Sequence, residues 1–191
     1  MSHGVAAGQS ICEILLGHIP GALTASLATE AEDRHGTDWW VEHRSGKKIS
    51  VDCKVREKDF RLKGADDLAL ETWSCIEQRR IGWTRNPAKR TDYILWLWQD
   101  TGRWCLIPFP MLCQVFVHHW ERWRTAYQTS RQKTPERGYH SECTFVPRRE
   151  VWGEIYRVYS GDQVPAPSIS PIIWTPLPPI TDAVEQARLP L

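Results

Sequence analysis

Apolar residues in the first third of the chain change from helical to alternating spacing. Within residues 9–34 they recur every three or four positions, which predicts a helix, at Ile14, Leu15, Ile19, Leu23 and Leu27. Pro20 is expected to split or kink this helix, and Gly36 to cap its end. Residues 38–44 and 49–57 then alternate with a period of two around the turn sequence SGKK, so a β-hairpin is predicted.

The middle of the chain shows three further strand patterns and one helical pattern. Residues 67–77 alternate again, residues 92–98 are apolar on both faces as in a covered central strand, and residues 103–109 predict a short fifth strand. In residues 110–127 apolar positions recur every three or four residues, which predicts an amphipathic helix. Residues 129–142 are polar and are expected to form a loop.

The last part of the chain combines one more helix with a proline-rich end. Residues 147–159 predict a second amphipathic helix with Pro147 at its start. The proline-rich sequence after it predicts an extended arm, so we expect one domain at 1–160 and an arm at 161–191. The order of elements indicates an α/β fold with a mixed central sheet of about five strands, covered by helices on at least one face.

Composition limits the classes of protein that this chain can be. Its 191 residues, of which 41% are hydrophobic, suffice for one domain with a core. A net charge of +1 excludes a histone-like polycation, so any binding of nucleic acid must come from local clusters of Lys and Arg. The six cysteines are scattered, and no stretch has the basic and apolar pattern of an export signal or the ~20 apolar residues of a membrane span. We therefore expect a reduced, cytoplasmic protein.

The hairpin carries the clearest candidate chemistry. Strand alternation in ISVDCKVR turns Asp52 and Lys54 to the same face, about 7 Å apart along the strand. Asp38 lies at the start of the preceding strand and can approach Asp52 if the register allows it. Two carboxylates at one point repel each other unless they surround a cation, and oxygen ligands suit Mg²⁺ or Mn²⁺. Such a cation, with a lysine beside it, is an arrangement for hydrolysing a phosphodiester.

These residues resemble the motif of the PD-(D/E)xK nuclease superfamily, which includes restriction endonucleases, junction resolvases and phage recombination nucleases. The resemblance covers residues 26–75: Asp38 matches the first metal-binding acid, Asp52 the second acid and Lys54 the lysine of the triplet. Thr37 stands where the motif has proline, and Asp52 where glutamate is commoner. The resemblance implies a restriction-endonuclease-like α/β/α core and a Mg²⁺-dependent deoxyribonuclease.

Further residues complete the predicted site. The acid that many members of the superfamily supply from an upstream helix would be Glu30, with Glu32 or Asp33 as alternatives. Glu71 lies in an apolar strand, where an acid is paired, exposed on an edge strand or a further metal ligand. The predicted metal ligands are therefore Asp38, Asp52, Glu71 and the main-chain carbonyl of Cys53.

Basic residues near the hairpin indicate DNA as the partner. The acids alone would repel a phosphate backbone, and the residues expected to bind it are Lys47, Lys48, Arg56, Arg79, Arg80, Trp83 and Arg85. Trp83 could stack on a base or pack in the core. A homodimer, and a protein partner held by the proline-rich arm, are further expectations.

Other interpretations of the same residues stay open. Asp38, Asp52 and Lys54 could form a solvated hairpin face with weak ion pairs. The fold could also serve as an inactive module that binds nucleic acid or protein. A zinc site is a third alternative, drawn from His118, His119, His140 and Cys143 with Cys105 or Cys113.

Overall fold

The computed structural model describes residues 2–33, 36–133 and 138–160, which form two β-sheets and the helices packed on them. The larger sheet has five strands in the order β1-β2-β3-β6-β7. Strands β3 and β6 are parallel, and the other neighbouring pairs are antiparallel. The strands are β1 (Ala22–Leu27), β2 (Trp39–His43), β3 (Lys48–Arg56), β6 (Tyr93–Trp98) and β7 (Arg103–Pro108). The predicted α/β fold with a mixed sheet of about five strands is confirmed; the predicted arm at 161–191 lies outside the described residues.

A smaller antiparallel sheet was not predicted. Its strands lie in the order β5-β4-β9-β8, and they are β4 (Asp67–Cys75), β5 (Arg80–Ile81), β8 (Thr129–Lys133) and β9 (His140–Pro147). The strand predicted at 67–77 thus belongs to this sheet, and β1 supplies the fifth strand of the larger one. The loop predicted at 129–142 was wrong at 129–133 and 140–142, which belong to β8 and β9. Strand β8 is an edge strand with polar, mostly exposed side chains, so no apolar alternation marks it.

The helix predicted over 9–34 ends far earlier than expected. Helix α1 (Ser2–His18) stops two residues before Pro20, and the chain turns at Gly21, whose φ of +78° favours glycine. Strand β1 follows and pairs with β2. Leu23 and Leu27, which continued the helical spacing, are 63% and 71% exposed on this strand. Their spacing was therefore coincidental rather than the mark of a buried face.

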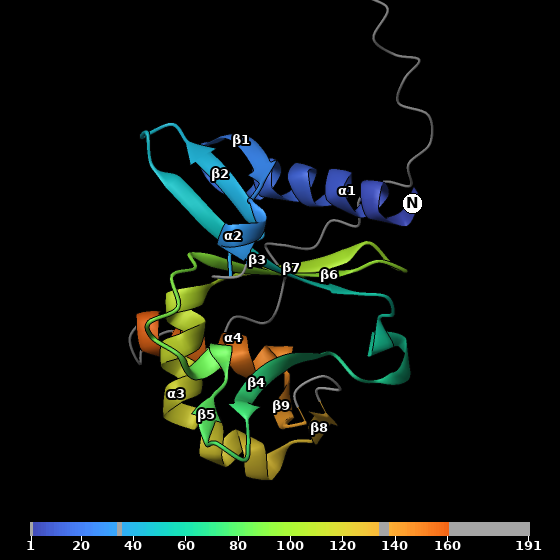
Figure 1. The fold of residues 1–191 in the computed structure, drawn as a ribbon, viewed down its shortest axis with the longest axis vertical. Helices are drawn as coiled ribbons and strands as arrows, with labels where there is room; N and C mark the ends of the chain where they lie inside the picture. The colour runs from blue at the N-terminus through green and yellow to red at the C-terminus, as the bar shows by residue number, and fades with distance from the viewer. Residues whose placement is uncertain (1, 34–35, 134–137, 161–191) are drawn as a thin grey trace, which may run out of the picture.

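The larger sheet is covered on both faces, as Figure 1 shows. Helix α1 packs on one face through Ile14 and Leu15, together with Val41 and Leu95 of the sheet. The other face meets the smaller sheet and two helices, α3 (Phe109–Ala126) and α4 (Arg148–Ser160), which confirm the helices predicted at 110–127 and 147–159. None of the helices in the described ranges is long and apolar enough to cross a bilayer.

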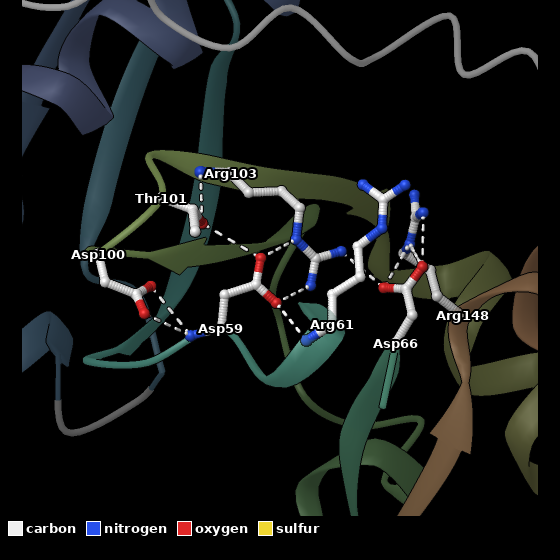
Figure 2. A network of polar contacts seen from close by, with 7 residues as sticks. All are labelled: Asp59, Arg61, Asp66, Asp100, Thr101, Arg103 and Arg148. Atoms are coloured by element: carbon white, nitrogen blue, oxygen red, sulfur yellow. Dashed lines mark hydrogen bonds and ion pairs between the residues drawn. The ribbon is translucent and has the colours of Figure 1, made fainter. Parts of the chain in front are cut away.

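A network of ion pairs fixes the segment that leads from β3 to β4, through the short helix η1 (Phe60–Lys63) (Figure 2). Arg103, at the start of β7, donates two hydrogen bonds to Asp59 and a third, of 2.6 Å, to Asp66. Arg148, at the start of α4, donates to the other oxygen of Asp66 at 2.9 Å. The side chain of Arg103 is 4% exposed, so the network links the larger sheet to the smaller one from a buried position.

Candidate active site

A pocket of about 710 Å³ opens beside the β2–β3 hairpin. It is bounded by the short helix α2 (Glu30–Asp33), the start of β2, strand β3, the helix η2 (Trp83–Arg85) and the loop that leads from η2 to β6. Its lining residues are Asp33, Gly36, Asp38, Asp52, Lys54, Trp83, Asn86, Ala88, Lys89 and Arg90. The structure therefore brings together the three residues of the predicted motif, Asp38, Asp52 and Lys54.

Asp38 is fixed against β3 by its main chain and its side chain. Its N–H donates to the carbonyl of Val51 at 2.9 Å, and its Oδ2 accepts a hydrogen bond of 2.5 Å from the N–H of Cys53. The pKa of this carboxyl is raised to about 6, chiefly by burial and also by the neighbouring acids Asp33 and Asp52, against the opposing effects of the Cys53 N–H and of Lys54. Asp38 is thus a partly buried acid with two further carboxylates, those of Asp33 and Asp52, in the same pocket.

Asp52 is buried and has an ammonium group on each oxygen. Lys54 Nζ lies 2.6 Å from Oδ1, and Lys89 Nζ lies 2.9 Å from Oδ2. The predicted alternation of β3 is confirmed, because Val51 and Cys53 pack with the core under α1 while Asp52 and Lys54 line the pocket. The negative charge of Asp52 is therefore compensated by two lysines of the pocket.

Lys89 was not among the predicted site residues, and it lies in the pocket lining. Its side chain is 10% exposed, and Nζ also donates to the carbonyl of Gly36 at 3.4 Å. Thr91 Oγ1 donates to the same carbonyl at 2.9 Å. A Cβ on Gly36 would lie 2.1 Å from Lys89 Nζ, and Gly36 has a φ of +89°. Glycine at position 36 thus gives Lys89 access to Asp52.

Trp83 packs in the core and forms part of the pocket wall. Its ring centroid lies 6.3 Å from those of Trp96 and Phe109. The ammonium groups of Lys54 and Lys89 lie 5.1 and 6.0 Å from its centroid. Trp83 thus packs against the core, as one of its two alternatives predicted, while the part of it that lines the pocket lies beside the two lysines.

Glu71 lies close to the pocket but is not one of its lining residues. Its Oε2 accepts a hydrogen bond of 2.9 Å from the N–H of Trp83. Burial raises the pKa of Glu71, while this hydrogen bond and the charges of Lys54 and Lys89 lower it. A role of Glu71 as metal ligand stays a prediction; its observed contact is with the main chain of Trp83.

Of the three candidate acids of the upstream helix, Asp33 is the one that reaches the pocket. Its carboxyl shares a hydrogen bond with that of Asp38, which raises the pKa of Asp38. Glu32 instead caps its own helix, since its Oε2 accepts from the N–H and the hydroxyl of Thr29. Glu30, the first choice from the sequence, is exposed and is absent from the pocket lining.

Most of the predicted DNA-binding residues lie outside the pocket lining. They are exposed at the hairpin turn (Lys47, Lys48), at the end of β3 (Arg56) and around the β4–β5 turn (Arg79, Arg80). Arg85 is half-buried, with its guanidinium 4.5 Å from the ring centroid of Trp73 and 3.6 Å from that of Trp120. Direct contact between Arg85 and DNA therefore requires this stack to open, whereas the exposed residues need no such change.

Two histidines of the alternative zinc site lie beside carboxylates. His140 Nδ1 lies 2.6 Å from Glu77 Oε1, and His119 Nε2 lies 3.3 Å from Glu154 Oε2. Over the three described ranges of the chain, no group of three or more His, Cys, Asp or Glu side chains is arranged to hold a metal ion. Asp33, Asp38 and Asp52 therefore line one pocket without forming such a group. Their carboxylate oxygens are hard donors, the kind that Mg²⁺ and Mn²⁺ prefer, so the fit to these ions lies in the type of donor.

Comparison of the chain with protein-family models, with curated proteins and with solved structures gives no match.

Proposed function

We propose that this chain is a metal-dependent nuclease of the PD-(D/E)xK type, which hydrolyses DNA phosphodiester bonds with Mg²⁺ or Mn²⁺. The observation that carries the proposal is the meeting of Asp38, Asp52 and Lys54 in one pocket. The pKa of Asp38, raised to about 6 by burial and by its acidic neighbours, supports a site that gains from a bound cation. The five-stranded mixed sheet between α1 and α3–α4 supports the restriction-endonuclease-like α/β/α core.

The cation would be held by Asp38, Asp52 and the main-chain carbonyl of Cys53. When bound, it would polarise a phosphoryl oxygen and lower the pKa of a water molecule. The hydrogen bond from the Cys53 N–H holds the Asp38 carboxylate in a fixed orientation. Lys54, whose side chain is 28% exposed, can orient the attacking water and donate to the phosphate while it stays close to Asp52.

Positive charge beside the acids supports DNA as the partner. Lys54, Lys89 and Arg90 line the pocket, and Arg90 is exposed, so a phosphate meets cations there as well as carboxylates. The exposed lysines of the hairpin turn would extend this contact along the strand. The six cysteines are free thiols, which supports the cytoplasm as the compartment.

A cleavage assay tests the proposal. Supercoiled plasmid and single-stranded DNA are incubated with Mg²⁺, Mn²⁺ or EDTA, with the wild type, Lys54→Ala and the control Lys133→Ala, which removes an exposed lysine of β8. We expect cleavage by the wild type and by Lys133→Ala in either metal, none in EDTA, and a loss of at least about 100-fold in Lys54→Ala. Full cleavage by Lys54→Ala would contradict this site, and no cleavage by the wild type would contradict the function.

A second candidate is an inactive module of the same fold that binds nucleic acid or protein. The observation that favours it is the pairing of both Asp52 oxygens with lysines, which satisfies that carboxylate without a metal. Such a module would shift labelled DNA in EDTA as well as in Mg²⁺, and would leave it uncut in both.

A further inference from the structure

Lys89 differs from Lys54 in the way the fold holds it. Lys54 lies on β3, two residues from Asp52, and strand pairing fixes its main chain. Lys89 comes from the loop between η2 and β6 and reaches Asp52 from across the pocket. A loop residue with a long side chain can leave its partner with less disturbance of the sheet than a strand residue can.

The geometry of Asp52 makes one of the two lysines a competitor of any cation. An ammonium group 2.9 Å from a carboxylate oxygen opposes the binding of a divalent cation to the same oxygen, because the two positive charges repel each other. We therefore expect the pairing of Lys89 with Asp52 Oδ2 to open when a cation binds there. The displaced ammonium group is poorly exposed and needs a new anionic partner.

We propose that Lys89 is a movable positioning residue: it occupies Asp52 until a divalent cation binds, and then contacts the phosphate of the DNA strand. This rests on the proposed nuclease function and adds a residue that the motif does not contain. Asn86 and Arg90 line the same side of the pocket from the same loop, so a phosphate that meets Lys89 also meets an amide and a guanidinium group. Trp83, which is half-buried and packs against the core, lies within 6.0 Å of the Lys89 ammonium group and forms the wall of the pocket beside it.

Lys89→Gln tests both roles of Lys89, because it should strengthen the binding of a cation and weaken the binding of DNA. In Lys89→Gln the competitor is gone, so Mn²⁺ should bind about tenfold more tightly in the absence of DNA, as measured from the electron paramagnetic resonance signal of free Mn²⁺. The phosphate contact is gone as well. A fluorescein-labelled duplex with Ca²⁺, followed by anisotropy, should therefore bind about tenfold more weakly. Lys133→Gln, which removes an exposed lysine of β8, should leave Mn²⁺ binding unchanged.

Gly36→Ala separates the two roles. A Cβ at this position would lie 2.1 Å from Lys89 Nζ and should push the ammonium group away from Asp52 without removing it. We expect tighter binding of Mn²⁺ but retained binding of the duplex. Because Gly36 has a positive φ, far-ultraviolet circular dichroism must first show that the variant is folded. If it is not, Lys89→Arg, which keeps the charge, should bind the duplex within about threefold of the wild type.

The outcomes distinguish this inference from the proposed function. Mn²⁺ affinity of Lys89→Gln equal to or below that of the wild type overturns the competitor role, and unchanged binding of the duplex overturns the phosphate role. Either result leaves the nuclease function intact if the wild type cuts DNA. A wild type that neither binds Mn²⁺ at millimolar concentration nor cuts DNA removes the function, and this inference with it.

Discussion

The carboxylate of Asp38 lies 2.5 Å from the main-chain N–H of Cys53, so an acid that precedes β2 is fastened to the strand that carries Asp52 and Lys54. The register of the hairpin, in which Trp39 is opposite Val51, sets this contact. A slip of the register by one residue would turn the side chains of β2 to the other face and separate the two acids. The geometry of the pocket therefore depends on the packing of Trp39 and Val51 under α1.

Asp38→Asn should stabilise the protein at high pH. Burial raises the pKa of Asp38 from 3.8 to about 6, so its contribution to stability is fully present below pH 3.8 and is lost as the pH rises through about 6. An amide can accept the Cys53 hydrogen bond without a charge. We expect a gain of about 1–2 kcal/mol at pH 8, discounted for partial exposure, and a smaller gain at pH 5. Urea denaturation at the two pH values measures it; an equal gain at both would contradict the raised pKa.

Asp52→Ala should have the opposite effect on stability. It leaves Lys54 and Lys89 as two neighbouring cations without their shared carboxylate. We expect a loss of about 1–3 kcal/mol in the free energy of unfolding, measured by urea denaturation at pH 7. The double variant Asp52→Ala, Lys89→Ala should recover part of this loss, because the repulsion is removed. A double variant no more stable than Asp52→Ala would show that the lysines do not repel.

Divalent cations should stabilise the wild type in thermal melts. A ligand that binds only the folded state, at a concentration a hundred times its dissociation constant, adds about 2.7 kcal/mol to the free energy of unfolding. We expect Mn²⁺ to raise the melting temperature of the wild type by a few degrees, and that of Asp38→Ala by much less, since a carboxylate of the donor set is missing. His140→Ala, which removes a residue of the alternative zinc site, should respond like the wild type. If Mn²⁺ raised the melting temperature of Asp38→Ala as much as that of the wild type, the cation would bind at another site.

Arg103→Met should destabilise the fold without touching the pocket. It leaves Asp59 and Asp66 without the guanidinium that joins them (Figure 2), at a cost of about 3–5 kcal/mol. Burial alone would raise the pKa of Asp59, but the hydrogen bonds from Arg103 lower it below 3.8. The stabilisation by this pair is therefore present at neutral pH and lost as the pH falls below 3.8. Urea denaturation at pH 7 measures the loss, and Arg80→Met, at an exposed position, should change stability by less than about 0.5 kcal/mol.

The spacing of apolar residues in the sequence predicted those features that depend on neighbouring residues alone. The alternation of β3 correctly placed Asp52 and Lys54 together, because side chains of a strand alternate wherever the strand lies. It failed at β1, where Leu23 and Leu27 have helical spacing on an exposed strand face. Lys89 was missed for another reason. It joins Asp52 because β6 pairs in parallel with β3, and strand pairing across such a distance leaves no local pattern.

The parallel pairing of β3 with β6 also bears on the order in which the pocket forms during folding. The β2–β3 hairpin closes a short turn, and we expect it to form within microseconds and to bring Asp38 to Cys53 early. Contact of β3 with β6 requires closure of the long segment that contains β4 and η2, which slows it. Pulse-labelling hydrogen exchange would show this as protection of the Cys53 amide before that of Leu95. The acidic half of the pocket would then exist before its second lysine arrives, and a nascent chain could expose these carboxylates to cations before Lys89 covers them.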